Sequence, residues 1–288
     1  MNVLITGAGG QLGRELMATA PATCNVIGLT RSELDITDEK AVENAMREHM
    51  PALIINAAAY TAVDPAESDQ SAAFAVNAAA VGTLASAAGS IGAHLVHVST
   101  DYVFDGARTQ AYAPSDARNP ISVYGRSKAA GEDAVGADAT IIRTSWIYAA
   151  SRQNFVTTML RQMQDTGQVA VVMDQIGVPT WVPGLAGATW ALGIRKLPGV
   201  WHHCDAGVAS WYDFAVAIAE EARLLGLLSR PVTVSPIFTS EHPTPARRPQ
   251  FSVLDATRTH AALGTRAVHW RTNLRAMLAE QADRGLAF

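Results

Sequence analysis

The stretch Val3-Leu4-Ile5-Thr6-Gly7-Ala8-Gly9-Gly10-Gln11-Leu12-Gly13 decides the fold. A short apolar strand runs into a glycine-rich turn, and residues 14–20 have the composition of a helix. Gly7, Gly10 and Gly13 allow a tight turn, let backbone N–H groups approach a diphosphate, and permit close contact between helix and strand. A glycine triplet alone also occurs in ordinary structural turns. Because this one follows the first strand and opens a helix, and because a second apolar run follows at residues 26–29, it predicts a dinucleotide-binding βαβ unit.

Short apolar runs recur along the chain, bounded by polar residues or glycine and mostly followed by helix-like stretches. They cover residues 3–5, 26–29, 53–55, 95–98, 140–142 and 169–172. Buried parallel strands joined by helical crossovers have this rhythm. The sequence therefore predicts an α/β fold with a doubly wound parallel sheet of the Rossmann type.

The regular alternation loosens after Trp146, and eight of the thirteen prolines lie beyond it. Long loops over the carboxyl edge of a parallel sheet are typical of a smaller substrate-binding lobe. We expect residues 1–148, together with about 168–200, to form the Rossmann domain. Residues 201–288, with part of 149–167, are expected to form mainly the C-terminal substrate-binding lobe.

One helix of that lobe can be predicted with its cap. Residues 210–225 carry apolar side chains at helical spacing, beginning with Trp211. Ser210 precedes them and Asp213 follows three residues later, which is the pattern of a capping box. The simplest interpretation of this helix is packing of the lobe.

The composition excludes several classes of function. A chain of 288 residues with 49% hydrophobic residues is globular, and its net charge of −4 offers no basic surface for nucleic acid. Cys24 and Cys204 lie far apart in no metal-binding spacing, so we expect a reduced, cytoplasmic protein. The N-terminus has no signal-peptide pattern, and we see no stretch of about 20 apolar residues, so no membrane partner is expected.

The residues after the second apolar run bear on the choice of cofactor. NAD-preferring sites usually place an Asp or Glu there to hold the ribose 2′-hydroxyl. This chain has Thr30-Arg31-Ser32 instead, and a hydroxyl beside a guanidinium could hold a 2′-phosphate. The pattern favours NADPH and leaves NADH open, because Arg31 could also be an ordinary surface residue. Asp35 is expected to lie near the adenine region.

A catalytic constellation follows in the middle of the chain. Ser99-Thr100-Asp101 closes the apolar run 95–98, and Tyr124 and Lys128 then stand one helical turn apart. A tyrosine with a pKa of about 10 is a poor acid–base catalyst at neutral pH, but a lysine ammonium and an oxidised nicotinamide favour the phenolate. Tyr-x-x-x-Lys alone is common by chance, and Ser-Thr-Asp can be a simple turn. Their order after the glycine loop predicts an oxidoreductase in which Thr100 orients the substrate oxygen against Tyr124.

At this point the chain resembles the dTDP-4-dehydrorhamnose reductases, a group of extended short-chain dehydrogenases. Pieces in the same order run along the whole chain, at residues 7–13, 56–64 with Glu67, 99–104, 124–128, 143–146, 174–180 and 243–249. The glycine loop and Tyr-x-x-x-Lys mark only the superfamily. Ser-Thr-Asp-Tyr-Val-Phe, Arg-Thr-Ser-Trp and Pro-Thr-Pro-x-x-Arg-Pro are much narrower.

The resemblance implies reduction of dTDP-4-dehydro-L-rhamnose at C4 to dTDP-L-rhamnose, with hydride from the nicotinamide and a proton from Tyr124. It implies a cofactor site made of Gly7, Gly10, Gln11, Leu12 and Gly13 at the diphosphate, Thr30, Arg31, Asp35 and Ile36 at the adenosine, Ala59, Tyr60 and Thr61 at its middle, and Tyr124 and Lys128 at the nicotinamide end. It implies a substrate site made of Val63, Thr100, Asp101, Trp146 and Arg248. Trp146 would be an apolar wall for the sugar, unless it only packs in the core, and Arg248 suits a diphosphate because a guanidinium pairs with two phosphate oxygens.

Several alternatives stay open. Some relatives are described with Mg²⁺ at a dimer contact, and Glu15 stands at a plausible position. Val182-Pro183-Gly184 occupies the place where another carboxylate would be expected, so metal and homodimer are both in doubt. His202 and His203 would point opposite ways on a strand and make no metal pair. The rival functions are another nucleotide-sugar reductase or epimerase, and a non-catalytic regulatory subunit like that of methionine adenosyltransferase, which would not require Thr100, Tyr124 and Lys128 together.

Overall fold

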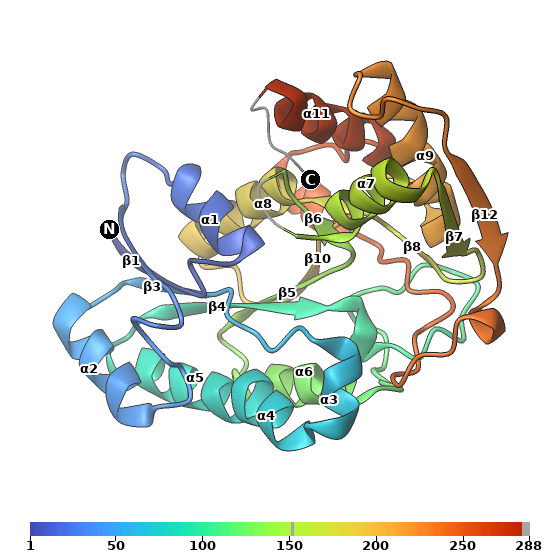
Figure 1. Cartoon of the computed structure of the whole chain (residues 1–288). Helices are drawn as coiled ribbons and strands as arrows, with labels where there is room; N and C mark the ends of the chain where they lie inside the picture. The colour runs from blue at the N-terminus through green and yellow to red at the C-terminus, as the bar shows by residue number, and fades with distance from the viewer. Residues whose placement is uncertain (151–152, 284–288) are drawn as a thin grey trace.

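A six-stranded parallel sheet forms the centre of the molecule, in a computed structural model that describes residues 1–150 and 153–283 (Figure 1). The strand order is β10-β5-β4-β3-β1-β2, and every neighbouring pair is parallel. The strands are β1 (Asn2–Thr6), β2 (Asn25–Leu29), β3 (Leu53–Asn56), β4 (His94–Thr100), β5 (Thr140–Thr144) and β10 (Gly199–His202). The order reverses beside β1, as in a doubly wound fold, so the predicted fold class is confirmed.

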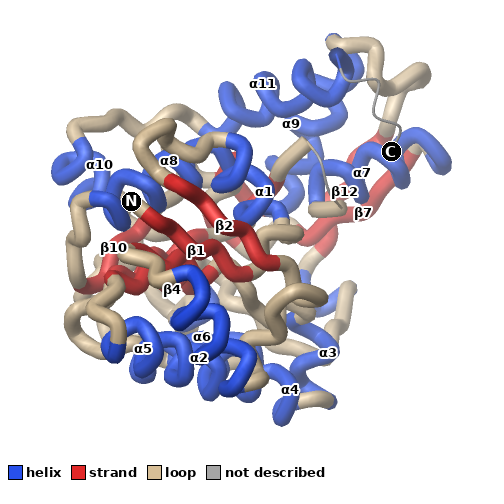
Figure 2. The backbone as a smooth tube through the Cα atoms, turned by 90° about the vertical axis from the view of Figure 1, so that its left-hand side faces the viewer, coloured by secondary structure: helices blue, strands red, loops and turns tan. Residues whose placement is uncertain are grey.

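Helices cover both faces of this sheet (Figures 1 and 2). One face is covered by α2 (Glu39–His49), α5 (Ala80–Ser90) and α6 (Val123–Ala134), and the other by α1 (Gln11–Ala18) and α8 (Val182–Ile194). Alternate residues of each strand point to opposite faces. Leu4 and Ile54 accordingly pack toward α2 and α5, whereas Val3, Ile5 and Leu53 pack toward α8.

A continuous helical stretch over Gln70–Ser90 precedes β4. It consists of α4 (Gln70–Phe74), a π-helical turn η1 (Ala75–Ala79) and α5, and a short helix α3 (Val63–Ser68) lies before it. Length and composition alone would let this stretch cross a membrane, which the sequence analysis did not recognise. In the structure it packs against α2, α6 and β4, which is how the apolar helix of a protein core behaves.

A second lobe lies beside the carboxyl edge of the sheet. Its elements are β6 (Ile147–Tyr148), α7 (Phe155–Thr166), β7 (Gln168–Val172), β8 (Ile176–Gly177), β9 (Thr180–Trp181), β11 (Ala209–Ser210), α9 (Trp211–Leu224), β12 (Thr233–Ile237) and α11 (Trp270–Asp283). The short helix α10 (Thr257–Leu263) packs back on α8 and β10. The lobe has its own core around Phe214, Met277 and Leu160. The predicted helix is confirmed, because Ser210 caps α9 in a capping box with Asp213.

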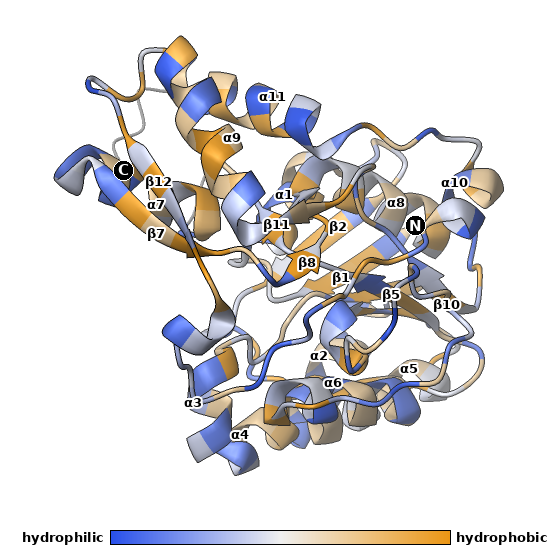
Figure 3. Ribbon diagram, turned by 90° about the vertical axis from the view of Figure 1, so that its right-hand side faces the viewer, coloured by the Kyte–Doolittle hydropathy of each residue, from blue (hydrophilic) through white to orange (hydrophobic). Residues whose placement is uncertain are grey.

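The expectation that residues 169–172 form a strand of the central sheet is wrong. These residues form β7, which pairs with β12 in a separate two-stranded sheet of the second lobe (Figure 2). The segment is strongly apolar, as Figure 3 shows, but Gln168 and Ala170 are exposed while Val169 and Val171 are buried. Such alternation fits a sheet with one covered face, and a run this short does not reveal its partner. The sixth central strand is β10 instead.

Candidate active site

The glycine-rich stretch Gly7–Gly13, here called the glycine cradle, begins as a tight turn at the carboxyl end of β1 and leads into α1. Gly7 has a φ of +70°, and a Cβ there would lie 2.6 Å from the backbone nitrogen of Ala58 in the loop after β3. A Cβ at Gly13 would lie 2.2 Å from the carbonyl oxygen of Gly7. Gly10 is the N-cap of α1, with no side chain capping the helix. The N–H groups at this end of α1 are therefore available to an anionic group such as a diphosphate.

The loop after β3 is held by Asn77, a residue that the sequence analysis missed. The Asn77 amide accepts a hydrogen bond from the Tyr60 N–H at 2.9 Å and donates to the Tyr60 carbonyl at 3.0 Å. It also donates to the Ser127 hydroxyl on α6 at 3.0 Å. Asn77 is fully buried in the π-helical turn, so it fixes Ala59-Tyr60-Thr61 relative to the helix that carries Tyr124 and Lys128. A π turn leaves no spacing signal that could have identified it.

The loop after β2 differs from the expectation in one respect. The first acidic side chain there is Glu33, which the sequence analysis passed over in favour of Asp35. The Glu33 carboxylate accepts from the Thr30 N–H at 2.8 Å and the Thr30 hydroxyl at 2.7 Å, and these hydrogen bonds lower the pKa of Glu33. Arg31 is exposed beside it. The position therefore offers both a cation and an anion to the ribose of a dinucleotide.

Three other cofactor candidates are engaged by the fold itself. Asp35 accepts hydrogen bonds from the N–H and the hydroxyl of Thr37, which lower its pKa. The side chains of Leu12 and Ile36 belong to the two apolar clusters on opposite faces of the sheet. Leu12 and Ile36 can therefore reach a cofactor only through their backbone.

Thr100 and Tyr124 meet at the carboxyl end of β4. Thr100 is the last residue of β4, and its side chain lies close enough to Tyr124 to lower the tyrosine pKa. Burial has the larger effect and raises the pKa of Tyr124 to about 12. The ring of Tyr102 packs edge-on against Tyr124, with ring centroids 5.6 Å apart. The Tyr124 hydroxyl therefore keeps its proton at neutral pH in this structure.

Lys128 lies one turn after Tyr124 on α6, as predicted, but its partners are unexpected. Its Nζ donates to the carbonyl of Val98 at 2.7 Å and lies 3.3 Å from Nε2 of His97. Burial lowers the pKa of Lys128 to about 8. The expectation that the Lys128 ammonium lowers the Tyr124 pKa is not met here, because burial, Thr100 and Asp101 set that pKa.

Asp101 is a buried carboxyl group beside this pair. Only 1% of the residue is exposed, and burial raises its pKa to about 6. One carboxylate oxygen accepts from the Thr100 hydroxyl at 3.0 Å. The Asp101 carboxyl therefore lies next to Thr100 and Tyr124, and its raised pKa of about 6 is not far below neutral pH.

Trp146 stands at a strained position where β5 leads into the second lobe. Its φ is +46°, which is rare for a large side chain. Its ring stacks on Trp211 of α9, with centroids 3.5 Å apart and planes 6° apart. A Cβ at Gly177 would lie 2.7 Å from the Trp146 ring, so the indole lies between α9 and β8. Trp211, which was predicted only to pack, extends this aromatic wall.

Arg248 is already paired within the chain. Its guanidinium donates to both carboxylate oxygens of Asp64, at 2.8 and 3.1 Å, and to the hydroxyl of Thr244 at 2.5 Å. Asp64 follows Val63, the first residue of α3, so the 244–248 loop is fastened to the helix that carries Val63. A substrate diphosphate would have to share Arg248 with Asp64.

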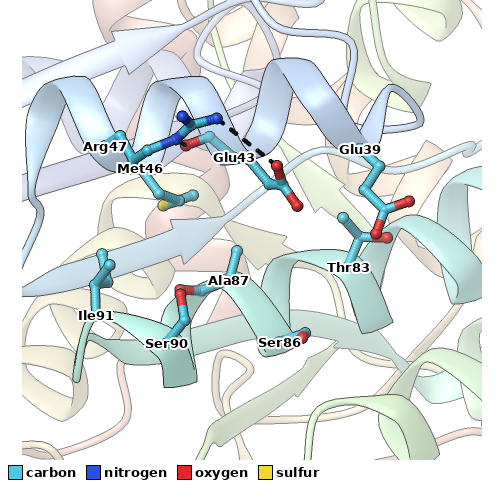
Figure 4. Close-up of a pocket in the computed structure, with 9 residues that line it drawn as sticks. All are labelled: Glu39, Glu43, Met46, Arg47, Thr83, Ser86, Ala87, Ser90 and Ile91. Carbon is cyan, nitrogen blue, oxygen red and sulfur yellow. Dashed lines mark hydrogen bonds and ion pairs between the residues drawn. The ribbon is translucent and has the colours of Figure 1, made fainter.

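Two surface grooves contain none of the predicted site residues. One lies between α2 and α5, and Figure 4 shows its mixed polar and apolar lining with an exposed ion pair between Arg47 and Glu43. The other is lined by α10 and by loops around Cys204. Among residues 1–150 and 153–283, no three His, Cys, Asp or Glu side chains are grouped to hold a metal ion.

Comparisons with known proteins agree with this geometry. A family model described as the RmlD substrate binding domain matches residues 1–282. The spore coat polysaccharide biosynthesis protein SpsK of Bacillus subtilis is 39% identical over 98% of this chain and 98% of its own. A dTDP-4-dehydrorhamnose reductase of Burkholderia thailandensis is 41% identical, over 94% and 96% of the two chains. The crystal structure of dTDP-4-dehydrorhamnose reductase from Bacillus anthracis in complex with NADP is 36% identical with a TM-score of 0.91, covering 97% of this chain and 99% of that one. The chain therefore belongs to the family of the RmlD substrate binding domain, as its resemblance to the dTDP-4-dehydrorhamnose reductases implied.

Proposed function

We propose that this protein is a cytoplasmic reductase that converts dTDP-4-dehydro-L-rhamnose to dTDP-L-rhamnose with a nicotinamide cofactor. The observation that carries the proposal is the meeting of Thr100, Tyr124 and Lys128 beside the glycine cradle at one edge of the sheet. A regulatory subunit would not require that set. The names of the relatives support the choice of sugar nucleotide.

The residues divide the work of the reaction. The cradle at Gly7–Gly13 and the loop Ala59-Tyr60-Thr61 would hold the dinucleotide, which supplies the hydride when bound. Thr100 would donate a hydrogen bond to the carbonyl oxygen at C4 and orient it against Tyr124. Tyr124 would protonate that oxygen as the C4 alcohol forms, because its hydroxyl keeps its proton at neutral pH. Lys128 would bind the ribose next to the nicotinamide.

The remaining predicted contacts concern the sugar nucleotide. We infer that the Trp146 and Trp211 rings provide an apolar wall for the 6-deoxysugar, since a strained backbone persists where the surroundings or the function require it. Arg248 would bind the diphosphate by exchanging part of its pairing with Asp64. Val63 and Asp101 would complete the sugar site.

The decisive experiment measures NADPH oxidation with dTDP-4-dehydro-L-rhamnose. We expect turnover by the natural protein, and a loss of kcat of about 10²–10⁴-fold in Tyr124→Phe, because general acid catalysis contributes an effect of that size. Tyr124→Phe should still bind the cofactor, which fluorescence titration measures. Turnover only with a different nucleotide sugar would overturn the substrate assignment, and a Tyr124→Phe enzyme of full rate would overturn the mechanism.

We further propose a preference for NADPH, set by Arg31 against Glu33. Arg31→Ala should lower kcat/KM for NADPH about tenfold and leave NADH little changed, since a charge-assisted phosphate contact contributes about 1.5–3 kcal/mol. Glu33→Gln is the matched variant, and it should improve NADPH relative to NADH by removing a negative charge beside Thr30. Equal losses for both cofactors in Arg31→Ala would contradict this assignment.

A further inference from the structure

A row of buried polar side chains crosses the sheet and ends at Lys128. Thr6 on β1 lies opposite Asn56 on β3, and Asn56 lies opposite His97 on β4. These three residues are at most 1% exposed, on the face where α6 packs. The helix lies directly over His97, because a Cβ at Gly131 would be 3.5 Å from its Nε2. The row therefore reaches the Lys128 side chain without contact with solvent.

Hydrogen bonds fix the direction of every donor along this row. The Asn56 side-chain oxygen accepts from the Thr6 hydroxyl at 2.7 Å and from the backbone N–H of Ala58 at 3.2 Å. A backbone N–H can only donate, so that atom of Asn56 is the oxygen and the other is the NH₂ group. This NH₂ group lies 3.1 Å from Nδ1 of His97 and must donate to it. Nδ1 is therefore an acceptor, and a neutral His97 carries its proton on Nε2.

The tautomer of His97 constrains the chemical state of Lys128. His97 is neutral, because complete burial holds its pKa well below the usual range. Its Nε2–H points at Lys128 Nζ, 3.3 Å away. An ammonium has no lone pair to accept this hydrogen, whereas an uncharged amine accepts it and still donates to the Val98 carbonyl.

We propose that His97, fixed in its tautomer by Asn56, is a positioning residue that stabilises the uncharged amine form of Lys128 relative to its ammonium form in the cofactor-free protein. Protonation of Lys128 then sets an N–H of the ammonium against the Nε2–H of His97. Ribose hydroxyls of the dinucleotide would offer the acceptors that an ammonium needs, so the inference rests on the proposed function for its role in the reaction. The tautomer of His97 and the protonation of Lys128 depend only on residues of this chain.

Other ionisable groups around Lys128 do not replace His97 in this role. Glu132 lies one turn further along α6 and raises the Lys128 pKa, but its carboxylate is shared by Arg143 and Arg118. Asp101 acts on Tyr124 rather than on Lys128. The neighbours from η1 and α6 itself, Asn77 and Ser127, are uncharged.

The test is a nuclear magnetic resonance measurement on the free protein. Long-range nitrogen–proton correlation in ¹⁵N-histidine-labelled protein identifies the tautomer of His97, with the signal assigned from His97→Gln. The chain has only three lysines, so ¹³C-lysine labelling follows Lys128 against the exposed Lys40 and Lys196. We expect His97 protonated at Nε2 and a Lys128 midpoint at about 8. A proton on Nδ1, or a Lys128 that titrates together with the two reference lysines, would overturn the proposal.

Three variants separate positioning from simple packing. His97→Leu removes the donor and should raise the Lys128 midpoint by about one unit, the equivalent of one hydrogen bond. His97→Gln places an NH₂ group near the former Nε2 and should keep the midpoint close to that of the natural protein. In Asn56→Asp the new carboxylate accepts a hydrogen bond from Nδ1–H of His97. Nε2 of His97 then becomes an acceptor for the Lys128 ammonium, so the Lys128 midpoint should rise by more than one pH unit. Equal midpoints in His97→Leu and His97→Gln would refute the role of the donor.

The pH profile of kcat/KM provides the link to turnover. In His97→Leu the part of this profile that reflects the titration of Lys128 should move to higher pH, by the same shift as the Lys128 midpoint in the free protein. In His97→Gln it should return to its position in the natural protein. If the Lys128 midpoint shifts in the free protein but the pH profile of kcat/KM does not, the link to turnover is refuted. Because tautomer and midpoint are measured without cofactor or sugar, a protein that meets both expectations but turns over no dTDP-sugar would contradict the proposed function alone.

Discussion

Replacing Glu132 by Gln should strongly destabilise the fold, because Glu132 is the centre of a buried charge network. Its side chain is 2% exposed and that of Arg143 is 3% exposed. Arg143 donates to both carboxylate oxygens, at 2.9 and 2.7 Å, and Ser99 donates to one of them at 2.5 Å. Arg118 adds a contact at 3.2 Å from a more exposed position. Glu132→Gln leaves the Arg143 charge buried without a counter-charge, which costs about 3–5 kcal/mol.

The measurement is urea unfolding at pH 7, followed by the fluorescence of the protein's six tryptophans. Ser99→Ala is the matched control, since it removes one neutral donor and should cost about 1 kcal/mol. Glu132→Met combined with Arg143→Met should cost clearly less than the sum of the two single changes, because no lone charge then remains in the core. The reasoning fails if Glu132→Gln loses under 1 kcal/mol, or if the double variant is simply additive.

Two further predictions concern the neighbourhood of α6. Gly131→Ala would place a Cβ 2.0 Å from the Asn77 carbonyl oxygen, so we expect a fall in the melting temperature. Gly89→Ala in α5 is the matched control, because its Cβ meets nothing within 4 Å and should stabilise the protein by about 0.5–1 kcal/mol. A Gly131→Ala protein as stable as Gly89→Ala would contradict the close packing. The raised pKa of Asp101, about 6 against 3.8, means that its contribution to stability is present below pH 4 and is lost as pH rises through 6. The natural protein should therefore lose about 3 kcal/mol of its free energy of unfolding between pH 4 and pH 8, and Asp101→Asn should not show this loss. Urea unfolding at both pH values measures the difference. The same pH dependence in both proteins would show that burial does not raise the Asp101 pKa.

The parts of the molecule that sequence could predict are those with local signals. The glycine loop, the strand runs up to 142 and the capped helix after Ser210 are each encoded within a few neighbouring residues, and the structure has them. β7 was assigned to the wrong sheet because its partner β12 lies more than sixty residues away and nothing in Val-Ala-Val-Val indicates it.

The candidate site divides in the same way. Thr100, Tyr124 and Lys128 were predictable from spacing and order, and the structure brings Thr100 to Tyr124. Asn77, Asn56 and His97 were not predictable, since each acts through a partner on another element and an isolated buried Asn or His usually means only satisfied packing. Glu33 could have been predicted, because its carboxylate stands three residues after Thr30, close to the expected position of the acidic residue that holds a ribose.

The chain passes between the sheet and the second lobe several times. It leaves the sheet after β5, returns for α8 and β10, leaves again for β11 to β12 and returns with α10, and the last described helix, α11, packs on α9. Val182, Leu185 and Trp190 of α8 cover the face of the sheet that Val3 and Ile5 present. A fragment cut near residue 148 would therefore lack α8 and expose the face of the sheet that this helix covers. Exchanging the lobe between relatives to alter sugar choice would need grafts at several junctions at once.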